Sequence, residues 1–96
     1  MIKRIVKLHF RIEETDAFVQ LFEDTKTQIR HFPGCLHLEL LRQKDDPAVF
    51  FTFSFWESEA ALEAYRQSEL FEKTWKATKA LFAEKAMAWT VQVVSA

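Results

Sequence analysis

The sequence predicts one α+β domain, residues 1–96, in which a four-stranded antiparallel sheet carries its helices on one face. Two observations predict this class. Apolar residues alternate with a period of two in four segments, as in half-buried strands, and recur at helical spacing in three segments between them. The resulting order, β-α-β-β-α-α-β, is that of ferredoxin-like folds.

The first strand and the first helix follow each other at the start of the chain. Residues 2–11 alternate between apolar and polar side chains, which predicts a strand that is buried on one face. Thr15 or Asp16 can cap the helix that follows, and apolar residues recur at helical spacing to about residue 31. The Pro33-Gly34 pair ends this helix, because proline cannot continue it and glycine favours a turn.

The next two strands, at residues 35–42 and 48–56, enclose a polar hairpin loop. The segment 48–56 is apolar on both faces, which predicts a central position in the sheet. One face carries Val49, Phe51, Phe53 and Phe55, and the other carries Phe50, Thr52, Ser54 and Trp56. We expect Phe50, Trp56 and Val94 to lie on the sheet face that the helices do not cover.

Two helices and a last strand complete the predicted order. Ser58 and Ser68 are suited to cap the helices, which we expect to continue to about residues 66 and 82. Apolar alternation then predicts a strand over residues 86–94. Since all helices are expected on one side, the other face of the sheet needs a cover, and a second copy of the chain would supply it.

Charge and composition argue against several classes of partner. The 13 basic and 14 acidic residues give a net charge of −1 and are interspersed, whereas nucleic-acid binding needs clustered lysine and arginine. The chain has no apolar run of about 18 residues that would span a membrane, and no segment typical of a signal peptide. Its single cysteine, Cys35, fits a reducing compartment, so we expect a cytoplasmic protein without membrane or nucleic-acid partners.

Aromatic residues are numerous for a chain of this length, with ten Phe, three Trp and one Tyr among 96 residues. Each ring buries roughly 150–250 Å², and a small domain has little interior in which to hide so many. We therefore expect some of these rings to line a ligand pocket and others to lie in a homodimer interface.

A metal site is not expected. His9 and His37 belong to strands that a third strand separates by about 9.6 Å, which is too far for bonds of about 2 Å to one metal ion. Cys35, His37 and Glu39 share one face of a single strand, but neighbours on that face are about 6.7 Å apart. His31 ends the first helix, where a positive charge suits the helix dipole.

One set of residues forms a more specific pattern than the rest of the chain. It comprises Pro33-Gly34-Cys35, Asp46-Pro47, Phe55-Trp56-Glu57-Ser58, Ala64-Tyr65 and Ser68. With this set, nearly the whole chain resembles the antibiotic biosynthesis monooxygenase family of the dimeric α/β barrel superfamily. The resemblance implies a homodimer whose sheets pack face to face. It also implies a monooxygenase that needs no metal or flavin cofactor and uses O₂ on a small aromatic substrate, such as a quinol or a polyketide-like ring.

Haem-degrading relatives in this family use an asparagine, a tryptophan and an iron-binding histidine. When the chain is aligned on Trp56-Glu57-Ser58, the tryptophan position falls on Tyr65 and the histidine position on Trp75. The asparagine position falls among residues 6–8, and the sequence contains no asparagine. Because indole cannot bind iron as imidazole does, we do not expect haem chemistry.

For an oxygenase without a cofactor, the resemblance implies an apolar pocket between the helices and the sheet. The expected substrate-binding residues are Tyr65, Phe71, Trp75, Leu8 and Phe10. Tyr65 could orient or deprotonate a phenolic substrate, or could simply be a half-buried ring. No residue stands out as the proton acceptor, so no catalytic residue is assigned. The alternative function is a non-catalytic dimeric domain that binds a small molecule or has a structural role.

Overall fold

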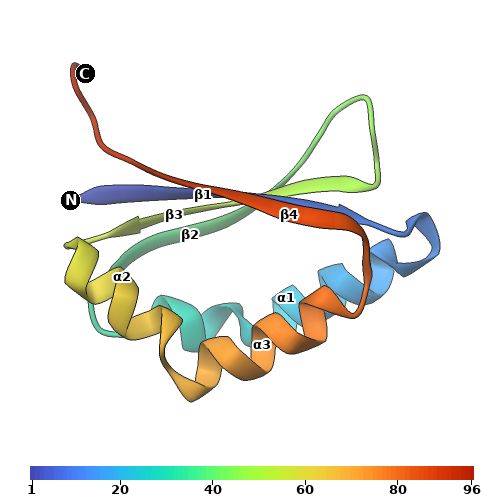
Figure 1. Cartoon of the computed structure of the whole chain (residues 1–96), viewed down its shortest axis with the longest axis horizontal. Coiled ribbons are helices and arrows are strands. Elements are labelled where there is room, and N and C mark those ends of the chain that lie inside the picture. The colour runs from blue at the N-terminus through green and yellow to red at the C-terminus, as the bar shows by residue number, and fades with distance from the viewer.

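In the computed structural model, which describes residues 1–96, a four-stranded antiparallel sheet lies above a layer of helices (Figure 1). The strands are β1 (Ile2–Phe10), β2 (Cys35–Arg42), β3 (Val49–Trp56) and β4 (Phe82–Val91). Their order across the sheet is β2-β3-β1-β4, so β3 and β1 are central and the other two are edges. The predicted α+β, ferredoxin-like order is confirmed.

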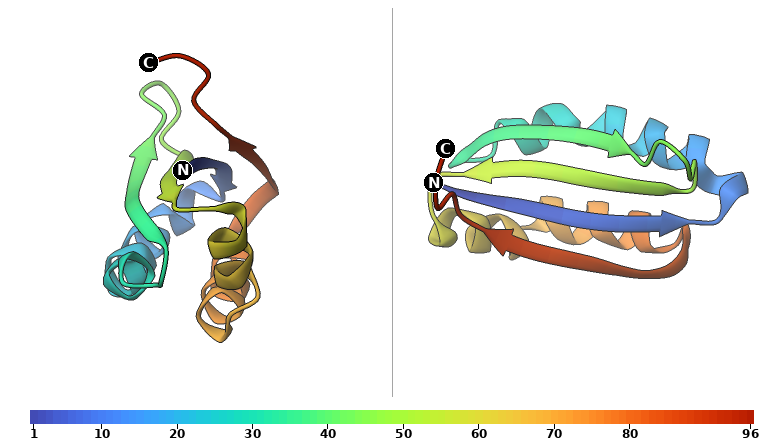
Figure 2. Two further views of the ribbon diagram at one scale, coloured as in Figure 1. Left: turned by 90° about the vertical axis from the view of Figure 1, so that its left-hand side faces the viewer. Right: turned by 90° about the horizontal axis from the view of Figure 1, so that it is seen from above.

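The helical elements are the 3₁₀ turn η1 (Ile12–Glu14), α1 (Thr15–Arg30), α2 (Glu59–Arg66) and α3 (Glu69–Lys79). Seen end-on, α1 and the α2–α3 pair lie side by side beneath one face of the sheet (Figure 2, left). The hydroxyls of Ser58 and Ser68 accept hydrogen bonds from the amides of Ala61 and Phe71, which confirms both predicted caps. No helix has the length and apolar character to span a bilayer.

The N-terminus of α1 differs from the prediction. The residue before the helix is Glu14, and no side chain accepts a hydrogen bond from the free amides there. Thr15 instead donates from its hydroxyl to the Ile12 carbonyl, and Asp16 lies in the first turn, where its charge suits the helix dipole. Because η1 leads directly into α1, neither predicted residue is the cap.

The boundary between α3 and β4 also differs from the prediction. α3 ends at Lys79 and β4 begins at Phe82, whereas the sequence pattern predicts a helix to residue 82 and a strand only from residue 86. β1 explains the early start, because its last residues pair with the beginning of β4. An edge strand tolerates polar side chains, so residues 83–85 lack the alternation from which the strand start was predicted.

The two faces of β3 are exchanged relative to our expectation. Phe50 and Trp56 are 2% and 1% exposed and lie on the helix side of the sheet. The register of the strands explains why, because Leu8 is paired with Phe50 and paired residues point to the same side of a sheet. Since Leu8 faces the core, Phe50 faces it as well, and Phe53 points away from the helices.

A closely packed part of the core lies at the end of the molecule where β1 leads into η1. The Phe10 ring stacks on Phe18 with centroids 4.1 Å apart and meets the edge of Phe50 at 5.7 Å. Aromatic pairs of this kind contribute about 0.5–1.5 kcal/mol each beyond the area that they bury. This filled end holds the sheet on α1.

No other element covers the sheet face away from the helices, which we call the open face (Figure 2, right). Its apolar side chains come from all four strands: Ile5, Leu41, Phe51, Phe53, Phe55, Met87, Trp89 and Val91. Met87 and Trp89 are 54% and 42% exposed. The β2–β3 loop and the C-terminal tail rise on this side of the sheet (Figure 1), and Val94 lies in that tail rather than in β4.

Candidate functional site

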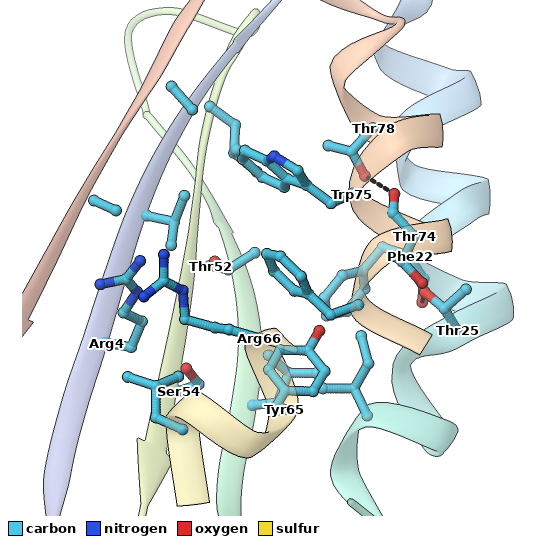
Figure 3. Close-up of a pocket in the computed structure, with 18 of the residues that line it drawn as sticks. Arg4, Phe22, Thr25, Thr52, Ser54, Tyr65, Arg66, Thr74, Trp75 and Thr78 are labelled. Carbon is cyan, nitrogen blue, oxygen red and sulfur yellow. Dashed lines mark hydrogen bonds between the residues drawn. The ribbon is translucent and has the colours of Figure 1, made fainter. Parts of the chain in front are cut away.

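A cavity of about 340 Å³ lies between the sheet and the helices (Figure 3). Residues of all four strands form its floor, and α1, α2 and α3 form its walls. Fourteen of the 21 residues that line it are hydrophobic. Pockets that enclose small molecules measure roughly 300–1,000 Å³, so this cavity suits one small ring system.

One wall of the cavity consists of stacked aromatic rings from β3, α2 and α3. Tyr65 stacks on Trp56 with centroids 4.9 Å apart, and Phe71 stacks on Trp75 with centroids 5.8 Å apart and planes 10° from parallel. Phe71 also meets the edge of Tyr65 at 5.3 Å. The α2–α3 turn fixes this arrangement, because the Ser68 hydroxyl donates to the Tyr65 carbonyl and accepts from the Phe71 amide.

Tyr65, the only tyrosine of the chain, points its hydroxyl into the cavity (Figure 3). Burial, and to a smaller extent the nearby Cys35, raises the pKa of Tyr65 to about 12. At neutral pH the phenol is therefore protonated. It can donate a hydrogen bond to a ligand oxygen, but it is not a base, so its chemistry suits orientation of a phenolic substrate rather than deprotonation.

Several other polar atoms of the lining are already used by the protein. The indole Nε1 of Trp56 donates to Ser54 Oγ at 3.0 Å, which makes Trp56 an anchor at the junction of β3 and α2. The hydroxyls of Thr25 and Thr78 donate to carbonyls of their own helices at 2.9 and 2.8 Å. These groups shape the cavity without being free to bind a ligand through the same hydrogen atoms.

Two arginines lie at one end of the cavity. Arg4 extends from the helix side of β1 and Arg66 from the end of α2, and their guanidinium groups lie next to each other (Figure 3). Arg4 Nη1 donates to Thr90 Oγ1 at 2.8 Å, and Arg66 Nη1 lies 3.2 Å from Glu63 Oε2. Burial and the charge of Arg66 lower the pKa of Arg4, and Glu63 opposes this shift. Because Arg66 is exposed, this positive end is also the end that meets solvent.

Four of the five predicted substrate-binding residues line the cavity: Leu8, Tyr65, Phe71 and Trp75. The fifth, Phe10, is not part of the lining and belongs to the filled core. The physical reason is Phe18, whose ring stacks on Phe10 and occupies the space above it.

The lining also includes Arg4, Arg66 and the hydroxyl groups of Thr52 and Ser54, none of which was predicted from the sequence as part of the site. A signal for Arg4 was available, because it shares the alternating strand face of Leu8 and therefore points toward the helices. No local pattern places Arg66 beside it, since the two are brought together only by the packing of α2 on the sheet.

The structure contains no group of three or more side chains suited to bind a metal ion. His9 Nδ1 lies 3.2 Å from Glu84 Oε2, and His37 Nε2 lies 3.5 Å from Glu39 Oε2; both pairs are on the open face. The cavity lining includes no histidine, carboxylate or thiol, so Tyr65 and the two arginines are its ionisable groups.

Solved structures of low sequence identity share this fold. One crystal structure of an antibiotic biosynthesis monooxygenase has a TM-score of 0.92 at 23% identity and covers 99% of this chain and 100% of that chain. Rv0793 from Mycobacterium tuberculosis has a TM-score of 0.89 at 18% identity, with 99% and 96% covered. A variant of SnoaB from Streptomyces nogalater, a cofactor-independent oxygenase, has a TM-score of 0.88 at 16% identity, with 99% and 94% covered. At these identities the likeness shows the fold alone.

The sequence itself shows the family. No curated protein matches it, but the family model described as antibiotic biosynthesis monooxygenase matches residues 1–77. That range contains Tyr65, Phe71, Trp75 and both arginines of the cavity. It covers well over half of the 96 residues. The chain therefore belongs to the antibiotic biosynthesis monooxygenase family.

Proposed function

We propose that the protein is a monooxygenase that uses no cofactor and transfers oxygen from O₂ to a small aromatic substrate, either a quinol or a polyketide-like ring. Membership of the family supports the reaction class. The observation that carries the proposal is the cavity itself, enclosed between sheet and helices and walled by the rings of Tyr65, Phe71 and Trp75.

In this proposal the substrate ring lies against the stacked pair of Phe71 and Trp75. Contacts between aromatic faces and edges restrict its orientation, and the apolar lining keeps water from the reacting carbon. Tyr65 donates a hydrogen bond to a phenolic or carbonyl oxygen of the substrate, which fixes the position of the ring along the cavity. Its raised pKa keeps that donor available throughout the neutral range.

The substrate supplies the electrons. An activated CH₂ carbon, as in an anthrone, loses a proton and then transfers one electron to O₂, which gives a carbon radical and superoxide. These two radicals combine to form a C–O bond, and protonation of the peroxide gives a hydroperoxide. Loss of water leaves a ketone, so that CH₂ and O₂ become C=O and H₂O without an added reductant.

The first proton has no acceptor in the lining, since the cavity holds no carboxylate or imidazole and Tyr65 stays protonated. The proton therefore leaves through water at the end that meets solvent. We expect the rate to rise with pH until the substrate itself is ionised, because no protein base with a lower pKa takes part.

We also propose that the protein is a homodimer that pairs through the open face. A second copy presents the same apolar surface about a twofold axis, so both exposed patches are covered at once. Charges of both signs are available to fix the register, with Lys3 and Lys7 on β1 and Glu39 and Glu84 on the edge strands. The loop and the tail that rise on this side would flank the partner (Figure 1).

A non-catalytic domain that binds a small molecule is the second candidate. The observation in its favour is the absence of a general base among the residues that line the cavity. This candidate uses the same cavity and the same dimer, and differs only in that the bound molecule is not oxidised.

Oxygen uptake separates the two candidates. Metal-free protein is mixed with anthrone or a reduced naphthoquinone in an oxygen electrode, and autoxidation in buffer is subtracted. The proposal expects saturable uptake with one ketone formed from anthrone per O₂, and a fall of roughly tenfold in kcat/KM for Tyr65→Phe. His31→Ala, at the exposed end of α1, is the control and should leave the rate unchanged. Uptake at the buffer rate for every substrate would reject the enzyme, and ligand quenching of tryptophan fluorescence would then favour the binding domain.

A further inference from the structure

The two arginines at the positive end of the cavity have no role of their own in the proposed reaction. Arg4 and Arg66, which we call the arginine pair, place two charges at one end of a mostly apolar space. Arg66 has a carboxylate partner in Glu63, but none of the six salt bridges of the protein involves Arg4. Arg4 makes one side-chain hydrogen bond, to the neutral Thr90. Since a guanidinium group has five N–H donors, Arg4 keeps donors for another partner.

The arginine pair is unfavourable as it stands. Two like charges are close together, one of them is half-buried, and Glu63 is the single carboxylate beside them. If the residue at position 4 only had to close the end of the cavity, an apolar side chain would be sufficient. An anion held between the two guanidinium groups would remove the repulsion and compensate for the lost hydration of Arg4.

We propose that the cavity binds an aromatic carboxylate, with its ring against Phe71 and Trp75 and its carboxylate between Arg4 and Arg66. The planar guanidinium group can form two parallel N–H···O bonds to a carboxylate, which gives direction as well as charge. The apolar floor and aromatic wall fit the ring and exclude a ligand that is charged throughout. This inference rests on the proposed function in that the cavity must be the ligand site, and it narrows the substrate class to an aromatic acid.

The surface next to the arginine pair favours the approach of such a ligand. A more open hollow beside α3 adjoins the cavity and shares Arg66, Phe71 and Trp75 with it. This hollow contains three basic residues and one acidic residue: Arg66, Lys76, Lys79 and Glu72. The excess of positive charge attracts anions toward the entrance, and the arginine pair then receives the carboxylate.

The test uses two probes with the same rings, 2-naphthoate and 2-naphthalenemethanol. They differ in that one carries a carboxylate and the other a neutral hydroxymethyl group, and neither is a substrate for the proposed oxygenation. Calorimetry of the full chain at neutral pH measures both affinities. We expect 2-naphthoate to bind at least about tenfold more tightly, since hydrogen bonds to charged groups are the stronger ones. The difference should shrink as salt is added.

Substitutions locate the effect. Arg4→Gln and Arg66→Gln should each weaken 2-naphthoate binding roughly tenfold or more and leave the alcohol within about twofold. Arg4→Lys should restore part of the affinity, because lysine keeps the charge but not the two-bond geometry. Arg11→Gln, an arginine outside the cavity at the start of η1, is the matched control and should bind like the wild type.

The possible outcomes separate this inference from the proposed function. Equal affinity for the two probes, or equal loss of both in the arginine variants, would overturn the carboxylate site even if anthrone is oxidised. Selective binding of 2-naphthoate that depends on both arginines, without oxygen uptake on any substrate, would keep the carboxylate site and reject the monooxygenase. If Arg4→Gln does not fold, Arg66→Gln and Arg4→Lys still decide the question.

Discussion

The two faces of the sheet carry similar side chains in different surroundings. On the helix side, Phe10, Phe50 and Trp56 are each at most 2% exposed. On the open face, Met87 and Trp89 are 54% and 42% exposed. The difference shows that the apolar side chains of a strand do not by themselves reveal whether helices of the same chain cover them. The helices of the same chain cover one face, and the other is left exposed, which is why we propose that a second copy covers it.

The helix side is itself divided between a filled end and a hollow end. Phe10 and Phe18 are in direct contact at the filled end, whereas Tyr65 and Trp75 border empty space at the other. A void forfeits dispersion contacts, and a small domain has few of these to lose. A cavity of about 340 Å³ in a chain of 96 residues therefore supports the proposal that this end binds a ligand.

The largest expected effect concerns the open face. Phe53→Glu places a carboxylate in the middle of β3 on that face, where a dimer would bury two of them, with Lys3 Nζ 5.9 Å from the centre of the present ring. Removing a carboxylate from water costs several kcal/mol per ion, and one lysine at that distance does not offset the cost. The variant should therefore be monomeric in gel filtration, at 11.3 kDa. Gln28→Glu adds the same charge on the exposed side of α1 and should stay dimeric. A wild-type protein that elutes as a monomer would contradict the proposed interface.

The next effect distinguishes the filled end from the hollow end. Phe10→Ala removes a ring that is 1% exposed and stacked on Phe18, which should lower the free energy of unfolding by about 3–5 kcal/mol. Urea unfolding measures this loss. The folded fraction should bind 2-naphthoate with nearly unchanged affinity, because Phe10 does not line the cavity. A large loss of affinity with little loss of stability would show that Phe10 contacts the ligand after all, as the sequence analysis expected.

The comparison of faces also shows how far the sequence could predict this structure. Period-two alternation predicts four strands and their order, and helical spacing predicts the three helices that place Tyr65, Phe71 and Trp75 together. Alternation cannot assign the faces of β3, because both are apolar. Only the pairing of Leu8 with Phe50 decides which face is buried. The register between β1 and β3 depends on residues far apart in the sequence, and it places the two faces of β3 opposite to our prediction.

The polar end of the site was beyond local patterns for the same reason. Arg4 and Arg66 are 62 positions apart in the chain, and each has a charge that is ordinary for a surface residue. Their proximity depends on how α2 packs against the sheet, which no spacing within either segment encodes. The family resemblance predicted the ring-lined pocket, but it carried no expectation for these two residues.

A smaller effect is expected from the ionisation of Tyr65. Its pKa is about 12 in the folded protein and about 10 when unfolded, so the folded form holds the proton more tightly. The protonated phenol therefore contributes its full share of the free energy of unfolding below about pH 10. This contribution is lost as the pH rises to about 12, and the total loss is roughly 2–3 kcal/mol. Tyr65→Phe should lack this loss when unfolding is compared at both pH values. Because the chain has one tyrosine, its ultraviolet absorbance titrates this group directly. A midpoint near the ordinary value would contradict the buried hydroxyl.

The smallest effect on stability is expected at the wall of the cavity. Trp75 is half-buried, stacks on Phe71 and lines the cavity. Trp75→Ala therefore enlarges an existing space and should lower the free energy of unfolding by about 1–2 kcal/mol, less than Phe10→Ala. The affinity for 2-naphthoate should nevertheless fall roughly tenfold, because the naphthalene ring of the probe no longer has the indole of Trp75 to pack against. Phe10→Ala should therefore lower the stability more than Trp75→Ala does, whereas Trp75→Ala should lower the affinity for 2-naphthoate more. If Trp75→Ala destabilises the fold as strongly as Phe10→Ala and leaves the probe bound, the hollow end is packing rather than a ligand site.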